Sequence, residues 1–255
     1  MANEVITRRN LPHWYMPHAF HFVTFRLAGT IPREVLDELQ LRKEALLRSA
    51  PPSASHRERI HKQLFADYDA YLDRNRTIHW LDSPPIAAVV HRSLYFWHGK
   101  KYGLFSYCIM PNHVHLLLQP FDAPASRDGE RELQGPGESS DARSPLADIM
   151  HSLKSYTADE ANKLLARTGS FWQHESYDHW VRDEDELERI LNCINANPVV
   201  AGLAERPHQF DWCAARDRYL YDGDESGWLI AQAVEQASSL ARQPGVAEPR
   251  APELQ

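Results

Sequence analysis

The chain has 255 residues, of which 43% are hydrophobic and 25% are charged, and its formal net charge is −7. This composition is typical of a folded globular protein, and the acidic balance argues against a protein that coats nucleic acid nonspecifically. A local basic groove remains compatible with it. The chain contains no apolar run long enough to cross a membrane, and its first residues lack the apolar stretch of a secretory signal. Three cysteines without CxxC spacing fit a reducing compartment, so we expect a cytoplasmic protein with no membrane partner.

The first third of the chain predicts one strand followed by three helices. Residues Phe20–Gly29 are aromatic and β-branched and end at glycine, which is typical of a strand. A helix is expected next, because apolar residues recur at helical spacing from Val35 to Leu46. A second helix is predicted at about His56–Arg74. A third, Pro85–His98, is apolar on most sides and is expected to pack deep in the protein.

The rest of the chain predicts two paired strands, a polar linker and two further helices. The strands, "YGLFSYCIM" and "HVHLLLQP", flank a turn at Met110–Asn112. The linker, about residues 121–144, is rich in Gly, Pro and Ser. A helix is expected at about Leu146–Leu165, then the extended stretch "SFWQHESYDHWV", then a helix from Glu184 to about Asn197 that Pro198 stops.

This order predicts an α+β fold: one antiparallel sheet with helices packed mainly on one face. We expect a single domain over residues 1–235, with a helical insert after the first strand at about residues 33–98. The tail, residues 236–255, is expected to be disordered.

Two histidines stand one residue apart in the predicted strand "HVHLLLQP". Side chains alternate along a strand, so His113 and His115 share a face with Leu117, while Val114 and Leu116 face the core. Two imidazoles so placed can bind one divalent ion, although an isolated His-x-His more often lies on a solvated surface. A catalytic ion also needs a third ligand, which this strand does not supply.

Several segments together resemble a known protein family. "MPNHVHLLLQP" resembles the metal-binding strand of single-tyrosine HUH transposases, and more closely that of the REP-associated tyrosine transposases. "FHFVTFRLAG", "HSLKSYTADEANKLL", "FWQHESYDHWVRDEDELERIL" and "NPVVAGL" are similar to other segments of that family. The resemblance extends from about Thr7 to Trp212, and the linker and the helical insert around residues 40–82 are less typical.

The resemblance implies a ferredoxin-like domain, usually a homodimer, that binds hairpin DNA and cleaves and rejoins a single strand. It implies that His113, His115 and Asn197 hold Mg²⁺ or Mn²⁺, which would polarise the scissile phosphate. In the family, a tyrosine four residues before the asparagine position attacks the phosphate and forms a covalent intermediate. Here the matching residue is Cys193.

The cysteine leaves three interpretations open. Helix geometry places Cys193 and Asn197 on one face, but the sulfur would fall roughly 3–4 Å short of a tyrosine oxygen. In the first interpretation strand transfer is lost, and a DNA-binding protein remains. In the second another tyrosine substitutes, either Tyr177 or Tyr156, although Tyr177 is more readily expected to pack beside Trp172. In the third Cys193 or a metal-activated water performs the cleavage.

Three basic residues are candidate contacts to DNA phosphates: Lys154, Arg26 and Arg182. Arg182 has an alternative structural role as a partner of neighbouring aspartates. A metal-dependent hydrolase without DNA and a structural zinc protein are competing classes, and the latter lacks the usual cysteine spacing. We interpret Asn112 as a turn residue that positions His113.

Overall fold

The computed structural model describes residues 5–8, 12–49, 54–121 and 144–222. The predicted linker, apart from its edges, and the predicted disordered tail lie outside these residues. None of the helices in the described ranges is both long and apolar enough to span a membrane.

Four strands form an antiparallel sheet: β3 (His21–Arg26), β4 (Tyr102–Ile109), β5 (His113–Pro120) and β6 (Tyr177–Trp180). Their order across the sheet is β4-β5-β3-β6. A helix crosses over between β3 and β4, and another between β5 and β6. This βαββαβ path with the first and third strands in the middle is the ferredoxin-like arrangement. The predicted α+β class and antiparallel sheet are therefore confirmed.

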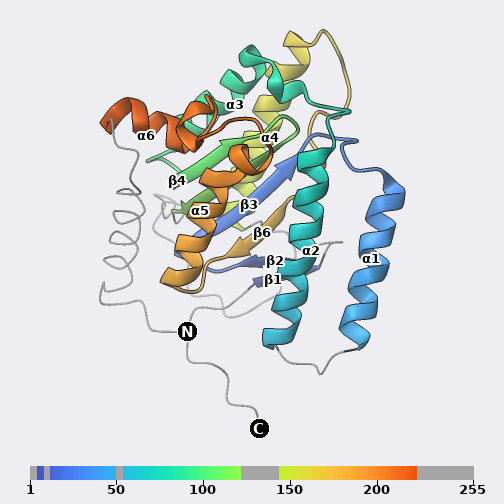
Figure 1. The fold of residues 1–255 in the computed structure, drawn as a ribbon. Helices are drawn as coiled ribbons and strands as arrows, with labels where there is room; N and C mark the ends of the chain where they lie inside the picture. The colour runs from blue at the N-terminus through green and yellow to red at the C-terminus, as the bar shows by residue number, and fades with distance from the viewer. Residues whose placement is uncertain (1–4, 9–11, 50–53, 122–143, 223–255) are drawn as a thin grey trace, which may run out of the picture.

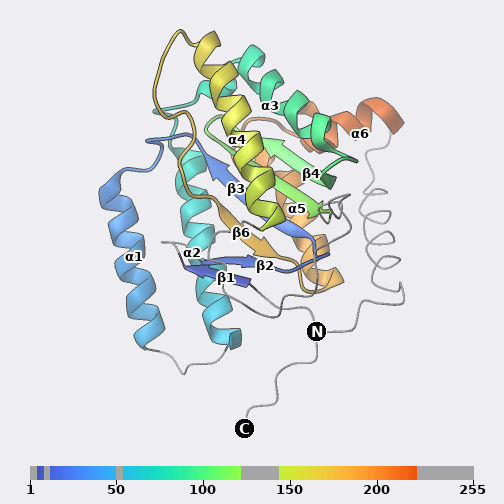
Figure 2. The same cartoon turned by 180° about the vertical axis from the view of Figure 1, so that it is seen from behind.

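Helices cover both faces of this sheet (Figures 1 and 2). The crossover helices α3 (Pro84–Trp97) and α4 (Pro145–Leu164) pack together on one face. The prediction that helices pack mainly on one face is therefore corrected, because a second helix-covered core lies on the other face. Helix α5 (Glu184–Val200) packs on the opposite face, where Leu187, Leu191 and Ile194 join a second apolar cluster. The late helix therefore lies over the face on which the two histidines were expected.

The side chains of β5 alternate between these two cores, as the sequence predicts. Val114, Leu116 and Leu118 join the core under α3 and α4, and Leu117 joins the core under α5. His113 and His115 share the face of Leu117. In the neighbouring strand, Arg26 pairs with His113 and Thr24 with His115.

The insert consists of two helices, α1 (Arg33–Arg48) and α2 (Ala54–Arg74), which lie beside the sheet (Figure 1). Helix α1 has no buried residue and packs against α2, to which Arg42 is joined by an ion pair with Asp67 at 2.8 Å. Helix α2 is fastened to α5 by the Lys62 Nζ–Glu186 Oε1 contact of 2.7 Å. Helix α3 was placed in the predicted insert, but it packs on the sheet as part of the core.

Helix α5 does not stop at Pro198, contrary to the sequence prediction. It continues to Val200, because a proline near the carboxyl end removes only one helical hydrogen bond. The end is set by Gly202, whose φ of 68° suits glycine. The Leu203 N–H donates to the Pro198 carbonyl and the Gly202 N–H to the Val199 carbonyl, a Schellman motif.

Five further elements of the described structure were not predicted from the sequence. Strands β1 (Val5–Arg8) and β2 (Pro12–Tyr15) form an antiparallel hairpin. Two short 3₁₀ helices are present, η1 (Trp80–Asp82) and η2 (Pro207–Gln209), and helix α6 (Ala214–Asp222) follows η2.

The segment around α6 protects the outer edge of the sheet. The Ile109 N–H of β4 donates to the Trp212 carbonyl at 2.8 Å, and Arg218 donates to the Phe105 carbonyl at 2.6 Å. Asp217 accepts hydrogen bonds from the hydroxyls of Tyr95 and Tyr107. These contacts use polar groups of an edge strand that would otherwise invite another strand.

Candidate metal centre

The two histidines of β5 converge through their outer ring nitrogens. The Nε2 atoms of His113 and His115 lie 2.9 Å apart, and both residues are at most 1% exposed. The rings meet nearly edge to face, with centroids 4.6 Å apart. Phe22 of β3 stacks on the His115 ring at 5.7 Å and closes one side of the pair.

The inner nitrogen of each histidine is held by a neighbouring side chain. The Nδ1 atom of His113 lies 2.6 Å from Asn112 Oδ1, and the Nδ1 atom of His115 lies 2.8 Å from Thr24 Oγ1. The amide of Asn112 has a fixed orientation, because its Nδ2 donates to the backbone carbonyls of Leu72 and Asn75. His113 therefore donates from Nδ1, which leaves a lone pair on Nε2. This confirms the interpretation of Asn112 as the residue that positions His113.

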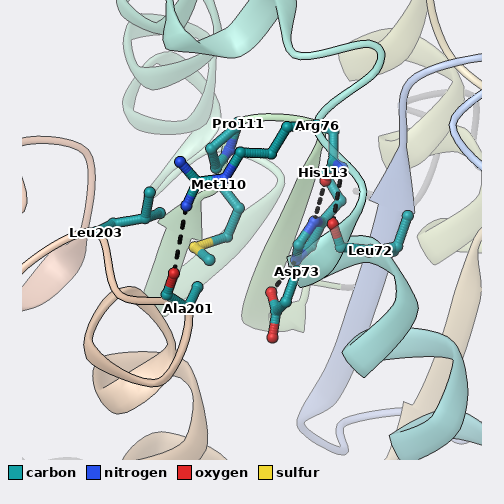
Figure 3. A pocket seen from close by; sticks show the side chains of 9 residues that line it. Leu72, Asp73, Arg76, Met110, Pro111, His113, Ala201 and Leu203 are labelled. Carbon is teal, nitrogen blue, oxygen red and sulfur yellow. Dashed lines mark hydrogen bonds and ion pairs between the residues drawn. The ribbon is translucent and has the colours of Figure 1, made fainter.

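Two carboxylates of α2 complete the cluster. Asp69 Oδ1 lies 3.3 Å from His115 Nε2 and 3.8 Å from His113 Nε2. Asp73, one helical turn later, places Oδ1 3.9 Å from His113 Nε2. Figure 3 shows Asp73 and His113 facing each other from α2 and β5. Both Oδ1 atoms are buried and accept no hydrogen bond from the described residues.

Burial governs the protonation of this cluster. Desolvation lowers the pKa of His113 well below its usual range and that of His115 to about 4, so both rings are neutral at pH 7. Desolvation also raises the pKa of Asp69 to about 7 and, with the Asp69 charge, that of Asp73 to about 6. The cluster therefore gathers groups that are poorly solvated when charged. Arg74 and Arg76 offset this effect at Asp73 only in part, since its pKa stays above the usual range.

This donor set fits a divalent cation. Ligand atoms from Asp69, His113 and His115 lie within 4.8 Å of one another. Two ligands at adjacent positions of an octahedral ion, each bound at about 2.1 Å, are about 3.0 Å apart, which matches the Nε2–Nε2 distance. Imidazole nitrogen with carboxylate oxygen suits Mn²⁺ and Zn²⁺ as well as Mg²⁺. The orphaned carboxylate oxygens would gain the partner that they lack.

The third ligand that the structure brings to the histidines is Asp69, whereas the sequence resemblance implied Asn197. Asn197 is only 4% exposed on α5, and across the described ranges no hydrogen bond connects its side chain with either histidine. Its role as a ligand therefore remains a prediction. Reasoning from the sequence missed Asp69 and Asp73 because they belong to the less typical insert. The available signal was two aspartates four residues apart, which share one face of a predicted helix.

Cys193 is exposed on α5, unlike buried Asn197. The pKa of its thiol is raised, first by desolvation and then by the charges of Asp69 and Asp73. The thiol is therefore within electrostatic range of the two carboxylates of the cluster. The two carboxylates disfavour a thiolate, which is the nucleophilic form of cysteine.

The alternative tyrosines lie in different surroundings. Tyr177, at the start of β6, pairs in register with Thr24 and stacks on Phe65 with ring centroids 4.2 Å apart. The expectation from the sequence that Tyr177 packs beside Trp172 was wrong, because the two residues belong to different cores. Trp172 lies in the other core and donates from Nε1 to Thr157 at 2.8 Å. Tyr156 is 56% exposed on α4, which covers the face opposite the histidines, so it cannot reach the cluster.

The three basic residues predicted to contact DNA differ in their exposure and in their partners within the protein. Lys154 donates to the carbonyls of Gln173 and His174 at 2.6 and 2.8 Å, so its ammonium is already engaged in holding a loop. Arg26 is only 3% exposed and donates from Nη1 to Thr30. Arg182 extends its guanidinium over the Trp180 ring, 5.2 Å from the centroid.

No protein-family model matches the chain, and no curated protein matches it either. Among solved structures, the chain is similar to a REP-associated tyrosine transposase bound to a REP hairpin. That match covers 85% of this chain and 86% of the other, with 12% sequence identity and a TM-score of 0.44. The likeness is distant, so it assigns no role to any residue of this chain.

Proposed function

We propose that the protein binds structured single-stranded DNA, such as a hairpin, and holds a divalent cation for cleavage and rejoining of one strand. The observation that carries this proposal is the convergence of His113 Nε2, His115 Nε2 and Asp69 Oδ1 in a buried cluster. The sequence "MPNHVHLLLQP" around His113 resembles the metal-binding strand of HUH transposases, and this resemblance is the reason for proposing DNA strand transfer.

Each residue of the cluster has a distinct task in this proposal. His113, His115 and Asp69 would hold Mg²⁺ or Mn²⁺, which when bound polarises a phosphate oxygen as a Lewis acid. Asn112 and Thr24 hold the two rings so that both Nε2 atoms point inward. Asp73 adds a second negative charge 3.9 Å from His113, so two carboxylates would balance the charge of a divalent ion.

The nucleophile distinguishes two versions of this function. Burial, and then the charges of Asp69 and Asp73, raise the pKa of the Cys193 thiol and so disfavour its thiolate. This observation favours the alternative in which the chain binds DNA and metal but has lost efficient strand transfer. Tyr177 remains the second candidate nucleophile, since its strand partner Thr24 contacts His115.

The test is incubation of a labelled hairpin oligonucleotide with Mn²⁺, followed by denaturing electrophoresis. A covalent adduct in the unaltered chain that disappears in Cys193→Ala would assign the thiol as nucleophile. An adduct that appears only in Cys193→Tyr would establish the impaired version. Cleaved DNA without an adduct, abolished by His113→Ala, would indicate hydrolysis by water. The proposal fails if the chain neither binds the hairpin nor binds Mn²⁺.

A further inference from the structure

Helices α2 and α5 run in the same direction and are joined by polar contacts towards both ends (Figure 1). In the first half of each helix, Lys62 Nζ lies 2.7 Å from Glu186 Oε1. Just beyond the carboxyl end of α2, Arg76 Nη2 donates to the Ala201 carbonyl at 3.3 Å, as Figure 3 shows. Because the earlier residues meet each other and the later residues meet each other, the two helices are parallel.

Asp69 lies between these two contacts along α2. It follows Lys62 by seven residues, and Cys193 follows Glu186 by the same number. Seven residues are two helical turns, about 10.5 Å, so each pair shares one face of its helix. Asp69 is therefore brought opposite Cys193, which agrees with the rise in the pKa of the Cys193 thiol, caused first by burial and then by the Asp69 charge.

Glu186 is a fixed anchor for the Lys62 ammonium. It is only 4% exposed, and its Oε1 accepts a hydrogen bond from His179 Nε2 at 3.0 Å. Its Oε2 accepts from the Arg182 N–H at 3.0 Å, and its own N–H donates to Asp183 Oδ1 at 2.7 Å. Burial alone would raise the pKa of Glu186, but hydrogen bonds from His179 and Lys62 outweigh it and lower that pKa. The carboxylate is therefore charged at pH 7 and held in one orientation.

The anchor belongs to the sheet face that carries the metal cluster. His179 of β6 pairs in register with Phe22 of β3, and the Phe22 ring stacks on His115 with centroids 5.7 Å apart. The Lys62–Glu186 ion pair therefore fixes the distance between α2 and the side of the molecule on which the histidines lie.

The other contacts of α2 leave this distance less well defined. Asn112 fastens the carboxyl end of the helix through the carbonyls of Leu72 and Asn75. Nearer the middle, Phe65 meets the Phe22 ring with centroids 5.4 Å apart, an apolar contact with little directional preference. A helix fastened firmly at one end needs a second polar contact to fix its tilt.

The tilt of α2 matters because metal ligands tolerate little displacement. Asp69 Oδ1 lies 3.3 Å from His115 Nε2 and 3.8 Å from His113 Nε2. Productive metal–ligand distances vary by only about 0.2 Å. A small rotation of α2 about its carboxyl end would therefore remove Asp69 from the ion.

We propose that the Lys62–Glu186 ion pair positions α2 so that Asp69 reaches the cation bound by His113 and His115. Lys62 and Glu186 do not touch the cation; they act through Asp69 and are positioning residues. The inference rests on the metal site of the proposed function. It also gives the helical insert a task, which is to carry the third ligand to the sheet.

Titration calorimetry of the full chain with Mn²⁺ tests the proposal. Lys62→Met should weaken Mn²⁺ binding by about threefold to tenfold, and Lys62→Arg, which keeps the charge and a donor, should restore it. The loss should be smaller than the 10–100-fold typical of residues that orient ligands directly, because the Lys62 side chain is 46% exposed. Thermal melting without Mn²⁺ should be nearly the same in all three chains, since the replaced side chain is largely on the surface.

Arg42→Met is the matched control. It removes an ion pair of similar exposure, 2.8 Å between Arg42 and Asp67, which joins α2 to α1 and not to the sheet. This variant should bind Mn²⁺ as the unaltered chain does. An equal loss in Arg42→Met and Lys62→Met would mean that the insert is merely loosened, and would overturn the inference.

Two further outcomes separate the inference from the proposed function. If the unaltered chain binds Mn²⁺ and His115→Ala abolishes binding, but Lys62→Met binds as tightly as the unaltered chain, the metal site stands and the positioning role is overturned. If the unaltered chain does not bind Mn²⁺, both are overturned.

Discussion

The Nε2 atoms of His113 and His115 lie 2.9 Å apart inside a core that excludes water from both rings. Asn112 Oδ1 accepts a hydrogen bond from Nδ1–H, the only ring N–H of neutral His113, so the Nε2 of His113 presents a lone pair to the neighbouring ring. Asp69 directs a third acceptor to the same point. Acceptors that converge in this way need a cation or a proton between them, and both rings are neutral at pH 7.

Binding of Mn²⁺ should therefore stabilise the protein. At a hundredfold excess over the dissociation constant, the free energy of unfolding should rise by about 2.7 kcal/mol. For a chain of this size the melting temperature should rise by about 5–10 °C and fall again on chelation. The measurement is differential scanning calorimetry with and without Mn²⁺.

The variant His115→Ala should lose this response, whereas His151→Ala, which removes an exposed histidine from α4, should keep it. An equal Mn²⁺ response in both variants would place the ion elsewhere in the chain.

Asn112 should control metal affinity without touching the metal. Asn112→Leu keeps the side-chain volume but removes the acceptor for His113 Nδ1 and the donor to Leu72 and Asn75. Residues that orient a metal-bound histidine commonly contribute about 10–100-fold to affinity. Titration calorimetry with Mn²⁺ should show a loss of that size, and the two carbonyls left unpaired should lower stability by about 1–3 kcal/mol. Unchanged affinity would mean that the His113 ring needs no fixed tautomer.

Much of the sheet could be predicted because its signals are local. The alternation in "HVHLLLQP" correctly assigned His113 and His115 to one face and Val114 and Leu116 to the other. The helix end at Gly202 was missed, since Pro198 is a more conspicuous breaker than a glycine that adopts a positive φ.

The metal cluster could be predicted only in part, because its ligands come from distant segments. Asp69 approaches His115 only after α2 docks beside the sheet, and no spacing in the sequence encodes that docking. The resemblance instead implied Asn197 as the third ligand, because Asn197 begins the segment "NPVVAGL", which is similar to a segment of the family. Lys154 was interpreted as a phosphate contact because nothing in the sequence reveals that its ammonium is used by the carbonyls of Gln173 and His174.

His21 should make the protein less stable in acid. Its Nδ1 donates to the Ala19 carbonyl at 2.9 Å, and its Nε2 accepts from the Met16 N–H at 3.3 Å. Burial lowers the pKa of His21 from 6.5 to about 4. The unfolded chain therefore binds more protons between these values, so stability is full above pH 6.5 and falls as the pH drops towards 4. One group with this shift contributes about 3 kcal/mol.

Urea unfolding of the unaltered chain and of His21→Phe, measured between pH 7 and 4.5, isolates this contribution. Phenylalanine keeps a ring that can stack on Tyr15, as His21 does at 5.3 Å, but it does not titrate. The variant should lose less stability on acidification than the unaltered chain, even though its stability at pH 7 is lower. Parallel curves would show that folding does not lower the pKa of His21.

Lys154 should behave as a structural residue. Its Nζ holds the carbonyls of Gln173 and His174 and lies 3.4 Å from Ser176 Oγ. Lys154→Met should lower the free energy of unfolding by about 1–3 kcal/mol, because two carbonyls lose a charged donor. Lys163→Met is the matched control on the same helix. Its ammonium is exposed and pairs with Glu160, so the change should leave the free energy of unfolding nearly unaltered.

The salt dependence of hairpin binding separates this role from a phosphate contact. Loss of one phosphate contact reduces the slope of log affinity against log salt by about one. Since the Lys154 ammonium is turned toward the loop, we expect Lys154→Met to leave this slope unchanged. A slope that falls by one with stability intact would reassign Lys154 to DNA and would mean that the loop carbonyls release it when DNA binds.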